Sequence, residues 1–143
     1  MTAMDRTAPV LHSIIAKLGA DTSLTALVGH RIYDVAPGRA MPPEMTLKLV
    51  SAADASTANT EAQVLNFDVD VWDRYALGAD LSRPRAIMDH VRRILHGQSI
   101  APVGCTVLEL RCTGAQGPFR DPDGVTLHGV VTVRALAGHE AAG

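Results

Sequence analysis

The residues that could ligate a metal ion or form a disulfide are six histidines and two cysteines. The histidines form no H-x-x-x-H or H-E-x-x-H pair with a carboxylate partner, which is the pattern of a zinc site on a helix. Cys105 and Cys112 are seven positions apart. On a regular strand they would point to opposite faces about 23 Å apart, too far for a disulfide. Their spacing also matches no common zinc or redox motif, so we expect two free thiols and no metal site.

Three other groups of residues have the composition of chemical motifs. Asp68 and Asp70 would lie about 7 Å apart on one face of a strand, a separation that could suit glycoside hydrolysis. The Asp-Pro-Asp-Gly stretch at 121–124 lacks the spaced ligands and the terminal glutamate of a calcium loop. Gly114 and Gly117 are followed by no strand-to-helix turn that could hold a phosphate. We interpret these groups as a solvated strand face, a hairpin turn and loop glycines, and we expect no catalytic residue and no cofactor.

Composition and charge bound the class of protein. The chain has 143 residues, of which 47% are hydrophobic and 20% charged, values typical of one globular domain. Its net charge of -2 argues against a basic surface that grips nucleic-acid phosphates. No apolar run reaches the roughly 18 residues that span a bilayer, and the N-terminus carries no secretory signal. We expect one soluble domain over residues 1–143, with flexible ends at 1–6 and 137–143, made in the cytoplasm and without membrane contact.

The stretch from Val64 to Arg74 should organise the fold. Hydrophobic residues at positions 65, 67, 69 and 71 alternate with polar residues at 66, 68 and 70, which is typical of a central strand with one buried and one solvated face. After a turn, Ser82–His96 has apolar residues at helical spacing. This segment is predicted to be the longest helix, capped by Asp80 or Ser82, and to cover the apolar face of the strand.

The other elements follow from periodicity and turn residues. Gly129 should mark a bulge or a close approach in the last strand, and Leu108 and Leu110 should share one face of the strand before it. These elements define an α+β fold, in which an antiparallel sheet of four or five strands packs against two or three helices. The predicted segments are two helices at Thr7–Leu18 and from about Asp21 to Gly29, strands at Arg31–Val35, Met45–Ser51, Cys105–Cys112 and Val125–Leu136, and long surface loops at Ala52–Ala62 and Gly114–Phe119.

Trp72 falls on the parity that should face solvent, beside Asp73 and Arg74. An exposed tryptophan flanked by charged residues has the composition of an interface anchor. The alternative is that a second helix or a loop covers this end of the sheet. The sequence does not distinguish the two.

Several short strings, in their order along the chain, resemble one protein family from about Leu11 to Leu136. They are L-x-A-x-x-x-L-x-A-L-V-G at 18–29, R-I-Y at 31–33, V-W-x-R at 71–74, I-x-x-x-V-R-R-x-L-H at 87–96, R-D-P-D-G at 120–124 and H-G-V-V at 128–131. Together they are similar to the small tail-terminator or tail-completion proteins of long-tailed bacteriophages and gene transfer agents.

This resemblance implies a structural virion protein and not an enzyme. It implies a hexameric ring at the neck end of the tail, which caps the tail tube, ends its polymerisation and binds the head-completion or connector protein, while double-stranded DNA passes through the lumen. A head-side connector protein and a small ligand-binding or enzymatic domain stay open as alternatives. The long loops at 52–62 and 114–119 are candidate contact arms. The candidate residues for contacts with neighbouring subunits or the tube are Arg31, Tyr33, Trp72, Asp73, Arg74, Arg120, Asp121 and Asp123.

Overall fold

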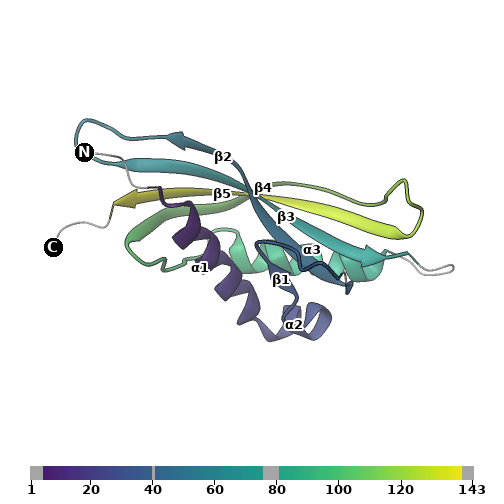
Figure 1. Cartoon of the computed structure of the whole chain (residues 1–143). Helices are drawn as coiled ribbons and strands as arrows, with labels where there is room; N and C mark the ends of the chain where they lie inside the picture. Colours follow the sequence, from purple (N-terminus) through teal and green to yellow (C-terminus); the bar gives the residue numbers. More distant parts are fainter. Residues whose placement is uncertain (1–4, 40, 76–80, 140–143) are drawn as a thin grey trace.

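The computed structural model describes residues 5–39, 41–75 and 81–139. Its strands form one sheet in the order β1-β2-β3-β5-β4, and the helices cover one face of that sheet (Figure 1). The fold is therefore α+β, as the sequence predicts. The elements in chain order are α1 (Thr7–Gly19), α2 (Thr22–Val28), β1 (Ile32–Tyr33), β2 (Glu44–Asp54), β3 (Ala62–Arg74), α3 (Ser82–Leu95), β4 (Cys105–Arg120) and β5 (Thr126–His139).

The sheet is mixed and mostly antiparallel. β1 pairs with β2 in parallel, with Ile32 opposite Met45, whereas the β2–β3, β3–β5 and β5–β4 pairs are antiparallel. The predicted antiparallel sheet is confirmed for β2, β3, β5 and β4, and the short β1 adds one parallel pair at the edge.

The core lies between the helices and the β3–β5 pair. The side chains of β3 that the alternation predicts to be buried, at positions 65, 67, 69 and 71, are completely inaccessible to solvent. Val131 and Val133 of β5 face the same side. α3 packs on both strands and buries Ile87, Val91 and Leu95 against them. The predicted arrangement of central strand and covering helix is confirmed.

The strands extend beyond the helices. β4 has 16 residues and α3 has 14, so the strand is about 50 Å long and the helix about 20 Å. In Figure 1, the β2–β3 and β4–β5 hairpins project past the helices at opposite ends of the sheet. The predicted loop at 52–62 is confirmed for residues 55–61 only, because Ala52–Asp54 belong to β2 and Ala62 to β3, and the predicted loop at Gly114–Phe119 is wrong, because these residues belong to β4. Their small and polar residues have low strand propensity, but pairing with β3 and β5 keeps them extended.

β4 has an irregular register. Its pairing with β5 shifts at three places, the first between Val107 and Glu109. This shift leaves Leu108 60% exposed, whereas Val107 and Leu110 pack on the core. The prediction that Leu108 and Leu110 share a face is wrong, because a bulge inserts one residue and reverses the alternation.

Cys105 and Cys112 form no disulfide with each other, as predicted. The same bulge turns both of them towards the core, so the prediction of opposite faces is wrong. Burial raises the pKa of the Cys112 thiol.

Both predicted flexible ends are partly ordered. The Arg6 side chain is 1% exposed, and its Nη2 atom lies 3.3 Å from Oε1 of Glu61. Ala137–His139 complete β5. Residues 1–4 and 140–143 lie outside the described residues, as does Asp80, one of the two predicted caps of α3. The residue at the N-cap of α3 is Leu81.

α2 is capped by Asp21. The Oδ1 atom of Asp21 accepts a hydrogen bond from the main-chain N–H of Leu24 at 3.0 Å. The same carboxylate binds Nη2 of Arg93, in the last turn of α3, at 2.9 Å. These bonds, the one from Arg93 first, lower the pKa of Asp21. One carboxylate thus caps α2 and joins it to α3.

Gly129 lies where β5 approaches Met88 of α3 closely. A Cβ atom at this position would collide with the Sδ atom of Met88. Met88 is 5% exposed, so it has little free space to move into. The predicted close approach is confirmed, and an added side chain here would require the Met88 side chain to shift.

We expect Gly129→Ala to reduce the free energy of unfolding by about 1–3 kcal/mol, because the added methyl group overpacks this contact. Urea denaturation would measure the change. Gly114→Ala is the matched control, since an added Cβ there meets no atom within 4 Å and should change stability by less than about 0.5 kcal/mol. In a Met88→Ala background the Gly129→Ala cost should largely disappear. An equal cost in both backgrounds would contradict this contact.

Candidate assembly surface at one end of the sheet

All eight candidate interface residues lie at one end of the sheet. Here β1, β2 and β5 begin, and β3 and β4 end. The sequence suggests these residues separately, and the fold brings them together. We call this group the sheet-end surface and include in it three neighbours, Asp70, Tyr75 and His128. Its role as an interface stays a prediction.

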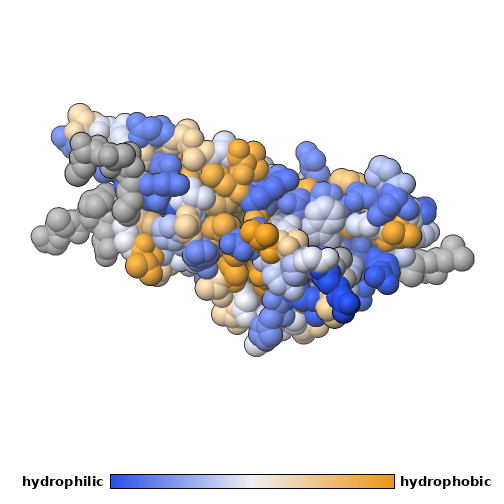
Figure 2. All heavy atoms as spheres, viewed as in Figure 1, coloured by the Kyte–Doolittle hydropathy of each residue, from blue (hydrophilic) through white to orange (hydrophobic). Residues whose placement is uncertain are grey.

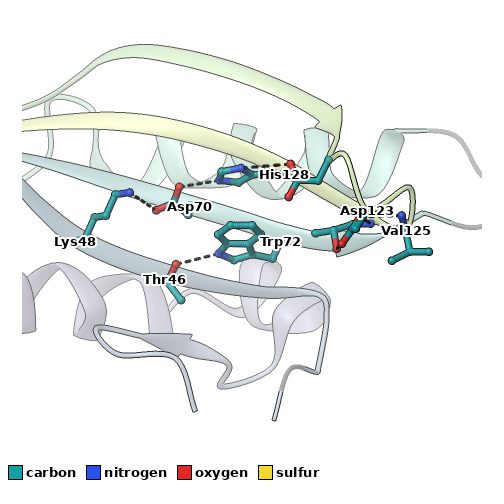
Figure 3. A network of polar contacts seen from close by, with 9 residues as sticks. Thr46, Lys48, Asp70, Trp72, Asp123, Val125 and His128 are labelled. Carbon is teal, nitrogen blue, oxygen red and sulfur yellow. Dashed lines mark hydrogen bonds and ion pairs between the residues drawn. The ribbon is translucent and has the colours of Figure 1, made fainter. Parts of the chain in front are cut away.

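Trp72 is half-buried because its ring packs against the neighbouring strand. The rings of Trp72 and His128 are stacked, with centroids 3.9 Å apart and planes inclined by 5°. Phe119 meets the same imidazole edge-on at 5.4 Å. The indole N–H donates to Oγ1 of Thr46 at 3.0 Å (Figure 3). The side chain that covers Trp72 is therefore His128 of β5. The sequence offered two alternatives, an exposed interface anchor and a ring covered by a helix or a loop, and the structure shows a third.

His128 lies between two carboxylates. Its Nε2 atom is 2.8 Å from Oδ1 of Asp70, and its Nδ1 atom is 3.9 Å from Oδ1 of Asp121. Nζ of Lys48 lies 4.0 Å from the other Asp70 oxygen (Figure 3). The Asp70 side chain is only 5% exposed, so the prediction that it is solvated is wrong. The stacked imidazole covers the carboxylate and gives it a hydrogen-bond partner, which burial requires.

Asp73 is bonded within the subunit. It is 2% exposed, and its two oxygens accept from Nε and Nη2 of Arg83 at 2.7 and 2.6 Å. The main-chain N–H of Arg74 also donates to Asp73, at 2.8 Å. The bidentate pair raises the pKa of Arg83. This ion pair joins the end of β3 to the start of α3. Of its two side chains, Asp73 is buried and Arg83 is 52% exposed, so Arg83 is the one that reaches the surface.

The β4–β5 turn is built by Asp123. Its carboxylate accepts from the main-chain N–H groups of Val125 and Thr126, both at 2.9 Å, and from the Thr126 hydroxyl at 2.5 Å. These bonds, with the hydroxyl first, lower the pKa of Asp123. Gly124 takes a positive φ of 77° in the same turn. The hairpin turn predicted from Asp123-Gly124 is confirmed.

Two arginines mark the edges of the sheet-end surface. Arg120 is exposed, and its guanidinium lies 4.0 Å above the ring of Tyr75. Arg31, before β1, donates through Nε to the carbonyl of Pro43 at 2.9 Å. Arg120 thus keeps its charge at the surface, whereas Arg31 partly serves to hold the start of β2.

Sequence reasoning missed the partners Asp70, His128 and Arg83. Alternation places Asp70 and Trp72 on one face of β3. Their contact with His128 arises only because β5 is the strand that pairs with β3. Periodicity does not encode that pairing. Among the described residues, no group of three histidine, cysteine or acidic residues could hold a metal ion.

The fold matches that of a chain within a virus-like particle. A solved structure described as "Virion of native gene transfer agent (GTA) particle" contains a chain that superposes with a TM-score of 0.76. The two chains are 22% identical, and the match covers 89% of this chain and 92% of that one. This match shows that the two chains share a fold.

The family model described as "Tail completion protein gp17" matches residues 12–138. The chain belongs to this family and is a structural component of a virion tail, which confirms the resemblance seen in the sequence. A search of curated proteins finds no match. None of the helices in the described part of the chain is long and apolar enough to cross a membrane.

Asp123→Ala should lower the melting temperature at pH 7, because the turn loses a charged acceptor. The folded pKa of Asp123 is depressed, so its contribution is present above the unfolded pKa of about 3.9 and is lost as pH falls through the folded value. The difference in melting temperature between the wild type and the variant should therefore shrink between pH 5 and the acid limit of folding. Thr126→Val, which removes one donor, should give a smaller difference of the same sign. A difference that does not change with pH would contradict this role.

Proposed function

We propose that the chain forms a hexameric ring that caps the tail tube, ends its polymerisation and joins the tail to the head-completion complex, while double-stranded DNA passes through the ring. Membership of the tail completion family carries this proposal. The chain acts through the shape of its assembly and performs no bond-making chemistry. It works at the neck end of the tail.

The sheet-end surface supports a docking role at this junction. It combines tryptophan, tyrosine and arginine, the residue types enriched at protein interfaces. Beyond the turn network, Phe119 and Val125 of the same hairpin are 45% and 57% exposed. An exposed ion pair contributes only about 0–1 kcal/mol, so we assign affinity to the aromatic and apolar side chains and orientation to the charges.

The charge of the chain suits a conduit for DNA. With a net charge of -2, the ring has no excess of positive charge that would hold phosphates and retard the passage of DNA. The helix-free face carries both signs, because Lys48 of β2 is opposite Asp68 of β3, and Arg134 of β5 is opposite Asn66, the preceding residue of β3 on that face. We propose this face, or the loops beside it, as the lining of the lumen.

Particles that lack this protein test the proposal directly. We expect tails of abnormal length and heads without tails in electron micrographs, because tube growth would have no end signal and the head complex no docking surface. Tails of normal length beside unjoined heads would instead indicate the head-side connector. Native mass spectrometry of the purified chain, alone and with tail tubes, should show six-membered rings. A monomer that never joins tubes would overturn the proposal.

Trp72→Ala and Arg120→Ala should weaken the attachment of the protein to tails or heads by about tenfold or more if the sheet-end surface is the docking site. Arg92→Ala, an exposed arginine on α3, is the matched control and should have little effect. Circular dichroism would show that each variant is folded. Unchanged ring mass and tail length in both surface variants would remove these residues from the interface.

A further inference from the structure

We propose that Glu44, the first residue of β2, forms an ion pair with a basic side chain of the protein that docks on the sheet-end surface. This inference rests on the proposed docking role and names the chemical group that the partner supplies. Glu44 lies at the same end of the sheet, where β2 begins and β3 ends. The chain buries its carboxylate there without giving it a partner.

The burial of Glu44 is not matched by any bond. The residue is 6% exposed, and its Oε2 atom is inaccessible to solvent. Within the described part of the chain, no hydrogen bond or ion pair reaches this carboxylate. The two other buried aspartates of this region differ, since Asp70 is bonded to His128 and Asp73 to Arg83. A buried charge without a partner is costly, and buried polar groups in folded proteins almost always have one.

The nearest basic residues of the chain are used elsewhere. Arg31 precedes β1 and adjoins Glu44 in the β1–β2 register, but its Nε atom donates to the carbonyl of Pro43 at 2.9 Å. Lys48, on the same face of β2, lies with its Nζ atom 4.0 Å from Asp70. Neither forms an ion pair with Glu44. The counter-charge of this carboxylate is therefore expected from another protein.

Glu44 lies on the face of the sheet that carries Trp72. Met45 and Leu47 point to the core, so Glu44 has the opposite parity, and it is directly opposite Trp72 in the β2–β3 pair. Opposed side chains in such a pair have Cβ atoms about 4.5–5.5 Å apart. A cation bound to Glu44 therefore lies beside the indole ring, where a cation–π contact adds to the ion pair. Beyond Trp72 on this face, Arg74 is exposed and lies past the start of β2.

The surroundings favour an arginine of a protein partner. A guanidinium group is more weakly hydrated than an ammonium group, so it loses less hydration when it enters a buried ion pair. In Figure 2, the end of the molecule that carries the β4–β5 hairpin is mostly hydrophilic, with a few hydrophobic side chains among the polar ones. Such a surface suits a partner with charged contact residues. The phosphates of DNA would be repelled by the carboxylate, so the group that binds Glu44 belongs to a protein.

Glu44→Gln tests the pairing, because it removes the charge and keeps the shape of the side chain. Attachment of the purified chain to tails and heads from particles that lack this protein would be measured by cosedimentation. We expect the variant to attach at least tenfold more weakly, since the cation of the partner loses its counter-charge. Glu109→Gln is the matched control, because Glu109 lies near Arg111 and Arg134, away from the sheet-end surface. It should change attachment less than twofold.

The melting temperature of the isolated chain separates docking from a structural role. Glu44→Gln should not lower it, because the carboxylate has no bond within the subunit to lose. A lower melting temperature would show that Glu44 supports the fold and would overturn the proposal. Unchanged attachment would also overturn it, as would tighter attachment, which indicates a negatively charged partner such as DNA. In these cases the proposed function still stands if the wild-type chain attaches and forms rings. A wild-type chain that attaches to neither tails nor heads would overturn both.

Discussion

The burial of one face of the β3–β5 pair beneath α3 is the constraint on which the rest of the structure depends. Phe67 and Val69 of β3 and Val131 of β5 are completely buried there, and each such side chain contributes about 1.5–3 kcal/mol. A slip of one residue in either strand would turn these side chains to solvent. The register is therefore strongly specified, and the polar residues of both strands are placed together on the other face. The stacked Trp72 and His128, and the buried Asp70 beneath the imidazole, are consequences of that register.

The sequence predicts the parts of the fold that repeat. Alternation identifies β3 and the core-facing side of β5, and helical spacing identifies α3, because both patterns come directly from burial. The length of β4 is not predictable in this way, since residues 113–117 are all exposed and only main-chain pairing keeps them extended. The bulge at Leu108 also leaves no periodic signal. It depends on how β4 aligns with β5, and that alignment is a property of two segments and not of one.

The candidate site is predictable to a similar extent. Trp72, Arg120 and the Asp123 turn stand out as exposed aromatic, charged or turn residues, and the fold places them at one end of the sheet. The sequence could not show that Asp73 is used internally by Arg83, or that His128 covers Asp70. Both depend on contacts between segments that are far apart in sequence. A carboxylate on a polar strand face is solvated only if no neighbouring side chain covers it, and here the neighbour is an imidazole.

The distribution of burial distinguishes the middle of the sheet from its ends. The central strands are held by the core, whereas the β4–β5 hairpin beyond α3 is held by its ladder, the Asp123 turn and the contact of Phe119 with His128. On its other side β5 pairs with β3 as far as Thr126 and buries Leu127, so the hairpin is joined to the central strands. A partner that binds only the ordered hairpin stabilises it. The gain in free energy grows with the logarithm of the ratio between the partner's concentration and the dissociation constant of the complex. Binding at this hairpin would therefore add stability to a segment that β3 and the Asp123 turn already hold.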